Sequence, residues 1–213
     1  MLKKYLRYVF LCVVAVGVFH ASAGSFDDFF VAIRNDNADV VSDLLQSGFD
    51  PNTRDSNGQP GLTIAIREDA LKVARVLLAR PETDVNALNQ AGESALMMAA
   101  LKGNLVGAEM LLARGAKVNQ SGWSPLHYAA AGPDPKMVQW LIDRGADVDA
   151  TSPNGTTPLM MAAQYGSEAS VDLLLSHGAD LKRRNERNLN AIDFARLSGR
   201  DWLVKKLEAL PPR

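Results

Sequence analysis

Residues 157–163 read TPLMMAA, and residues 124–130 read SPLHYAA. Similar stretches return as SALMMAA at 94–100 and NAIDFAR at 190–196. A hydroxyl side chain followed by proline is typical of a helix start, with the hydroxyl at the cap and the proline at the first helical position. Thr157-Pro158 and Ser124-Pro125 therefore predict the beginning of a helix, and the two similar stretches align with them.

Two weaker copies precede these four, FDDFFVAIRND at 26–36 and PGLTIAIRED at 60–69. The first apolar mark of the six copies is Phe29, Leu62, Leu96, Leu126, Leu159 or Ile192. Fifteen residues later stand Leu44, Leu77, Leu111, Leu141, Leu174 and Leu207. Three residues after each mark stands an alanine: Ala32, Ala65, Ala99, Ala129, Ala162 or Ala195. Such a fixed internal period indicates one supersecondary unit repeated six times.

Glycines are expected to end both helices of the unit. Gly103, Gly166 and Gly199 are placed to end the first helix in the left-handed conformation. The second helix is expected to end in the same way at Gly48, Gly115, Gly145 and Gly178. The segments G-A-x-V-[ND] that follow predict a short turn or hairpin.

These residues resemble the ankyrin repeat, whose signature includes T-P-L-H-x-A with a period of about 33 residues. The resemblance covers residues 25–210 and implies an all-α repeat solenoid of about six helix–turn–helix units with short β-hairpin or turn fingers. The approximate repeats are 25–54, 55–88, 89–120, 121–151, 152–184 and 185–213, with the first and last as caps. In such a solenoid each unit contacts only its neighbours.

The first residues have the composition of a secretory signal peptide. Lys3, Lys4 and Arg7 precede an apolar run from Val9 to Phe19, and Ala21-Ser22-Ala23 fits a cleavage site. We therefore expect residues 1–23 to be removed, leaving residues 24–213 without the single cysteine and with 20 basic and 24 acidic groups. This predicts a periplasmic protein, with secretion or retention at the inner membrane by an uncleaved signal as alternatives. The short, lysine-led signal favours a bacterial source.

The repeat pattern gives structural roles to the residues that resemble catalytic groups. Ser124, Pro125, Thr157 and Pro158 occupy helix starts. His127 fills the histidine position of the signature, which the resemblance implies is a hydrogen-bonding link between repeats. The methionine pairs at 97–98 and 160–161 are interpreted as core residues rather than a copper site. We expect no enzyme activity, no cofactor and no metal.

The resemblance implies that another protein binds the fingertips and the inner face of the first helices. Carried over repeat by repeat, the candidate contacts are Ser56, Asn57, Gln59, Arg67, Glu68, Gln90, Ala91, Glu93, Leu101, Lys102, Trp123, Pro153, Asn154, Thr156, Gln164, Tyr165, Glu186, Arg187 and Leu189.

The finger before residue 124 departs from the pattern. Val118 precedes Leu126 by 8 residues, whereas Val148 precedes Leu159 by 11. Trp123 on this shortened finger is either a binding hot spot or a cover for the missing tip, and both interpretations stay open. Pro133 stands where other copies have glycine, which predicts that Gly132 makes the turn in its place.

Charge is uneven along the chain, at −9 for residues 24–181 and +5 for residues 182–213. The basic run at 182–184 with Arg187 is either a solvated tip or a site that attracts an acidic partner. Net acidity and the export signal disfavour nucleic acid. We expect a monomeric, exported module that binds, stabilises, regulates or positions a partner protein, without membrane insertion after cleavage. The alternative is a secreted effector that binds a host protein, and an enzyme is the third hypothesis.

Overall fold

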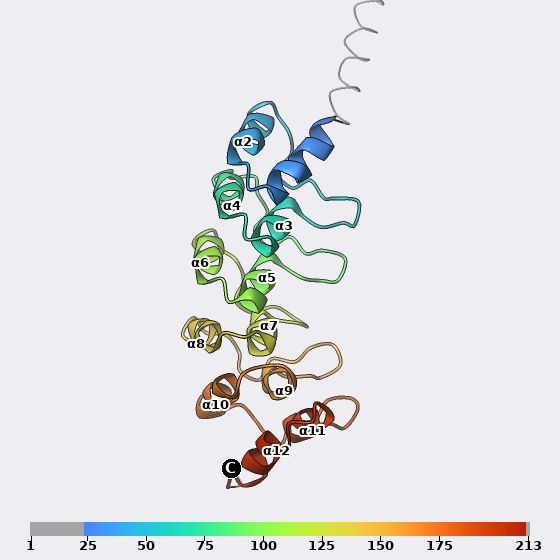
Figure 1. Ribbon diagram of the computed structural model, residues 1–213, viewed down its shortest axis with the longest axis vertical. Helices are drawn as coiled ribbons and strands as arrows, with labels where there is room; N and C mark the ends of the chain where they lie inside the picture. Colours follow the sequence, from blue (N-terminus) through green and yellow to red (C-terminus); the bar gives the residue numbers. More distant parts are fainter. Residues whose placement is uncertain (1–23, 212–213) are drawn as a thin grey trace, which may run out of the picture.

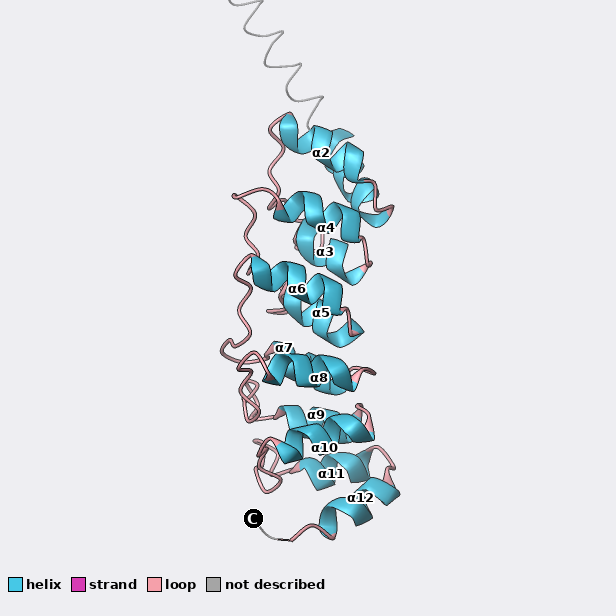
Figure 2. Ribbon diagram, turned by 90° about the vertical axis from the view of Figure 1, so that its left-hand side faces the viewer, coloured by secondary structure: helices cyan, strands magenta, loops and turns pink. Residues whose placement is uncertain are grey.

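The computed structural model describes residues 24–211, which form an elongated stack of helix pairs (Figure 1). One column holds the first helix of every pair, here called the inner helices, and a second column holds the outer helices. Long loops, here called fingers, project from the side of the inner helices, and both views place them along the same edge (Figure 2). The predicted all-α repeat solenoid is therefore confirmed.

Each pair is a short inner helix followed closely by an outer one. The first inner helix includes residues 24–34. The outer helices are α2 (Ala38–Gln46), α4 (Leu71–Leu78), α6 (Leu105–Ala113), α8 (Pro135–Ile142), α10 (Glu168–Ser176) and α12 (Asp201–Glu208). The remaining inner helices are α3 (Gly61–Arg67), α5 (Ala95–Lys102), α7 (Pro125–Ala131), α9 (Pro158–Gln164) and α11 (Ala191–Leu197).

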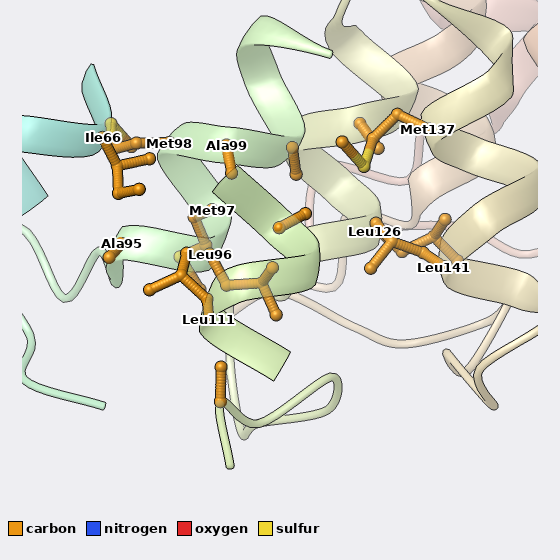
Figure 3. Close-up of a cluster of buried hydrophobic side chains, with 14 of the residues drawn as sticks. Ile66, Ala95, Leu96, Met97, Met98, Ala99, Leu111, Leu126, Met137 and Leu141 are labelled. Atoms are coloured by element: carbon orange, nitrogen blue, oxygen red, sulfur yellow. The ribbon is translucent and has the colours of Figure 1, made fainter. Parts of the chain in front are cut away.

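The core runs the length of the stack between the two columns. In the middle repeats the apolar marks of both helices are fully buried, as Figure 3 illustrates for Leu96, Leu111, Leu126 and Leu141. The alanine that follows each inner mark is buried in all six repeats. A small side chain there lets neighbouring inner helices approach closely, so burial and close approach depend on the same position.

In the two end repeats one of the two apolar marks is only partly buried. Leu44 and Ile192 are only partly buried, because each lacks a repeat on one side. At the amino-terminal end Phe29 packs against Phe30 and Phe49, with ring centroids 5.2 and 4.7 Å apart. Phe29 also lies against Gly61 of the next inner helix, so this aromatic cluster joins the first repeat to the second.

A ladder of side-chain amides joins successive repeats. The Asn52 amide donates to the Glu82 carbonyl oxygen at 2.8 Å and accepts from the Asp84 N–H at 2.7 Å. Asn86 and Asn119 make the same pair of bonds to the next turn, with Gly115 and Lys117, and with Gly145 and Asp147. The asparagine at this repeat position, which follows proline in the first copy and valine in the other two, therefore satisfies backbone groups of the following repeat.

The fingers are turns rather than β-hairpins. Among residues 24–211 the one β-type pairing is an isolated bridge between Arg54 and Pro60. Of the two forms expected for the fingers, the turn is the one the chain adopts.

Two of the glycine predictions are wrong. Gly103, Gly199 and all four glycines after the outer helices have positive φ, as expected, but Gly166 is absent from the positive-φ residues and Gly132 has φ −77°. Both are instead sites of close approach. A Cβ on Gly166 would lie 2.1 Å from the Ala130 carbonyl oxygen, and one on Gly132 would lie 2.7 Å from that of Leu101.

The predicted signal peptide, residues 1–23, lies outside the described residues. Within residues 24–211 none of the helices is long and apolar enough to cross a membrane.

Gly166→Ala and Gly199→Ala separate the two uses of glycine. Alanine at 166 forces the α7 and α9 backbones apart, so we expect a loss of about 1–3 kcal/mol in the free energy of unfolding. Gly199 has φ 69° and open space around its Cα, so alanine there costs about 1 kcal/mol of backbone strain. Urea unfolding followed by circular dichroism measures both, and an equal or larger loss for Gly199→Ala would contradict the close-approach explanation.

Candidate protein-binding surface

The predicted contact residues fall into three groups by exposure. Ser56, Asn57, Glu68, Gln90, Ala91, Leu101, Lys102, Pro153, Asn154, Tyr165, Glu186 and Arg187 are exposed. Gln59, Arg67, Glu93, Trp123, Gln164 and Leu189 are partly buried, and Thr156 is buried. Most of the set therefore lies where another protein can reach it.

Three large apolar side chains stand exposed where inner helices end. Leu101 is 39% exposed, and Tyr165 and Leu197 are each 63% exposed, at the ends of α5, α9 and α11. We call these three residues the inner-face apolar row. Exposed apolar side chains that recur on one face of a repeat stack are typical of a protein-binding surface.

Leu197 was not among the contact residues predicted from the sequence. It stands five residues after the mark Ile192, as Leu101 stands five after Leu96. Extending the repeat alignment by one position in the last copy would have found it.

Thr156 does not belong to the exposed surface. It is 2% exposed, and its carbonyl oxygen lies 2.9 Å from His127 Nε2. Its hydroxyl lies 3.5 Å from the Asn185 amide nitrogen. The residue connects three successive repeats, so its place in the binding set is corrected to a place in the scaffold.

Trp123 folds back from the shortened finger onto the start of α7. Its indole lies edge-on to His127 and Tyr128, with ring centroids 5.2 and 6.5 Å apart. The side chain packs on the core yet remains partly exposed. Of the two interpretations left open by the sequence, the structure supports the cover, with a part of the ring still at the surface.

The residue at the repeat position of His127 makes the same hydrogen bond in four repeats. Each time its side chain accepts the backbone N–H of the helix cap. The acceptors are Met97 Sδ for Ser94, His127 Nδ1 for Ser124, Met160 Sδ for Thr157 and Asp193 Oδ2 for Asn190, at 3.4, 3.1, 3.4 and 3.1 Å. Histidine differs from the other three in having a second nitrogen, which reaches the next repeat at Thr156. The sequence did not reveal the capping role of the methionines.

Ser124 and His127 have the spacing of a nucleophile and a base but not the surroundings. Ser124 Oγ lies 2.8 Å from His127 Nδ1, yet the two residues are 1% and 0% exposed. Because a carbonyl oxygen can only accept, the Nε2 facing Thr156 carries the proton, and Nδ1 accepts from the Ser124 N–H. The pair therefore fixes the start of α7 and links it to the next finger.

The basic run of the last finger bonds within the fold. Arg183 donates to the Asp149 carbonyl oxygen at 2.9 Å, and Arg184 donates to the carbonyl oxygen of Asn188. Arg187 is exposed. Two of the four cations thus shape the finger, which weakens the case for a dedicated anion-binding tip.

Comparison with known proteins assigns the family. The family described as "Ankyrin repeats (3 copies)" matches residues 29–121, 71–152 and 115–185. The chain belongs to the ankyrin-repeat family.

Relatives in this family are diverse. The chain is 33% identical over 157 residues to the nuclear factor NF-kappa-B p105 subunit of Gallus gallus, covering 70% of this chain and 16% of that protein. It is 32% identical over 124 residues to an ankyrin repeat-containing protein of Treponema pallidum, covering 57% of this chain and 42% of the relative. The ankyrin chain thus spans less than half the length of these curated relatives.

A solved structure resembles the whole stack more fully. One chain of the predatory endopeptidase Bd0816 from Bdellovibrio bacteriovorus in complex with immunity protein Bd3460 superposes with a TM-score of 0.73 at 26% identity. The match covers 86% of this chain and 98% of that one. As an ankyrin-repeat protein, the chain is a protein–protein interaction module.

His127 makes stability depend on pH. Burial lowers its pKa below the ordinary value of 6.5 despite the opposing hydrogen bond to Thr156. The unfolded chain therefore takes up a proton at this histidine at a higher pH than the folded chain. The contribution of His127 to the free energy of unfolding is thus complete above about pH 6.5 and is lost as the pH falls below that value. We expect the urea midpoint to fall between pH 7.5 and 5.5, and His127→Gln to reduce that fall.

The exposed His177 supplies the matched control. His177→Gln removes the other histidine of residues 24–211, and a larger change in His177→Gln than in His127→Gln would contradict the assignment to His127. An unchanged dependence in His127→Gln would show that other groups cause it.

Proposed function

We propose that this ankyrin-repeat protein is exported to the bacterial periplasm, where it acts as a monomer that binds a partner enzyme and restrains its activity. The observation that carries the proposal is the inner-face apolar row on a rigid stack. Exposed leucine and tyrosine side chains on a fixed scaffold lose little conformational freedom when a partner covers them. A binding role needs no reactive group on the ankyrin chain itself.

The likeness to a chain from a complex of an endopeptidase with an immunity protein supports this role. The match is nearly complete for that chain, so it concerns the whole stack rather than one repeat. An immunity-type role requires a stable, preformed surface, and the continuous core with its asparagine ladder supplies one. A hydrolytic enzyme of the same compartment is the partner class that this likeness favours.

Replacing two members of the row should release the partner. Affinity purification from the exporting compartment identifies the partner, and calorimetry then gives the dissociation constant. Tyr165→Ala with Leu197→Ala removes two exposed side chains, and we expect at least tenfold weaker binding at about 1 kcal/mol or more for each. Circular dichroism should remain unchanged, because neither side chain is in the core.

A matched control uses the outer helices. Val106 and Trp202 are 47% and 49% exposed on α6 and α12. Val106→Ala with Trp202→Ala removes similar apolar surface and should leave the affinity unchanged. Equal loss in the two double variants would contradict binding at the inner face.

Export has its own test. We expect the protein from the periplasmic fraction to begin at Gly24 when its amino terminus is sequenced. An intact amino terminus in the membrane fraction would indicate an uncleaved anchor. Accumulation in the culture medium would favour the effector role over the periplasmic one.

A further inference from the structure

The finger before α7 is shorter than its neighbours. Figure 1 shows the loop between α6 and α7 projecting less far than the loops on either side. Trp123 is the last residue of this finger before the Ser124 cap, and a Cβ placed on the preceding Gly122 would lie 3.6 Å from Pro153 of the following finger. Glu93 of the preceding finger bonds to Tyr128 of α7, and Tyr128 contacts the Trp123 ring, so side chains of two fingers and one inner helix are connected here.

Two aromatic rings beside the shortened finger meet at nearly a right angle. The planes of Trp123 and Tyr128 are inclined by 80°, with ring centroids 6.5 Å apart. Both side chains are partly exposed. We call Trp123, Tyr128 and Glu93 the aromatic corner. The faces of such rings carry a negative electrostatic potential that attracts cations.

A carboxylate is fixed at the edge of this corner. Glu93 Oε1 accepts from the Tyr128 hydroxyl at 2.8 Å, and Oε2 accepts from the Asn89 amide at 2.8 Å. Both donors are neutral, and within residues 24–211 no lysine, arginine or histidine forms an ion pair with Glu93. Glu93 therefore has hydrogen-bond donors but no cationic side chain as a partner within the described part of the chain.

The Tyr128 hydroxyl holds this carboxylate in place. Burial and the hydrogen bond to Glu93 raise the pKa of Tyr128, so its hydroxyl stays protonated. The neighbouring repeats have methionine at the position of Tyr128, where Met161 is partly buried and Met98 is buried in the core.

We propose that the aromatic corner binds a lysine or arginine side chain of the partner protein. The cationic head would lie against the exposed parts of the Trp123 and Tyr128 rings, within reach of the Glu93 carboxylate. An uncharged apolar side chain would instead cover Glu93 and leave its charge without a partner. The inference rests on the proposed function, since it specifies the chemistry of the residue that such a partner presents.

The test uses small probes that do not require the natural partner. The chain is labelled with ¹⁵N and titrated with acetyl-Gly-Arg-Gly-amide, with acetyl-Gly-Lys-Gly-amide, and with the norleucine peptide as the uncharged control. The indole N–H resonance of Trp123 is assigned by its loss in Trp123→Phe. We expect both cationic peptides to shift it with a Kd of about 10 mM or tighter, and the norleucine peptide to leave it in place.

Two variants show whether the carboxylate is responsible. Glu93→Gln keeps an oxygen for the Tyr128 hydroxyl but removes the charge, and should weaken the cationic peptides at least fivefold. Glu109→Gln removes an exposed carboxylate on the outer helix α6 and should have no effect. No shift, an equal shift with norleucine, or an unchanged Kd in Glu93→Gln would overturn the proposal.

This result is separable from the partner-binding experiment. A negative titration with intact dependence on Tyr165 and Leu197 would overturn the cation site alone and leave the binding role standing. A positive titration supports the aromatic corner even where the inner-face double variant binds its partner normally.

Discussion

Consecutive inner helices meet across a buried alanine in every repeat, and the rest of the structure depends on this close approach. A larger side chain at Ala99, Ala129 or Ala162 would separate the helices and open the core between them. Gly132 and Gly166 meet the same constraint at the ends of α7 and α9, where backbone atoms of the preceding repeat leave no space for a Cβ. The stack is therefore continuous because small residues recur at a fixed period.

The same constraint produces the binding surface. The inner helices follow one another closely in a single column. Residues at the same position of successive repeats therefore form a row on the exposed face. That is why Leu101 and Leu197, two residues from distant parts of the chain, belong to one surface, with Tyr165 one position further along its own repeat. Each repeat can change its exposed residues without altering its alanine, so affinity and folding are set by different positions.

The sequence predicted the fold closely because periodic burial is a local property. The marks, the alanines and the cap residues each depend on a helix that the pattern itself specifies. The predictions that were wrong concern contacts between repeats. Thr156 looks like a fingertip residue in one copy, but its neighbours His127 and Asn185 bury it. Gly166 looks like a left-handed helix end, but glycine is needed there because the Ala130 carbonyl oxygen leaves no space for a Cβ.

The missing three residues at the fourth finger illustrate how such a stack acquires a specific site. A full-length finger would extend past Tyr128, whereas the short one lets Trp123 turn back onto α7. The indole then packs edge-on to His127 and to Tyr128, and the Tyr128 hydroxyl in turn bonds to Glu93 of the preceding finger. The shortening thus places an aromatic side chain on the core at the one finger that departs from the repeat, next to a tyrosine whose hydroxyl bonds to a carboxylate of the preceding finger.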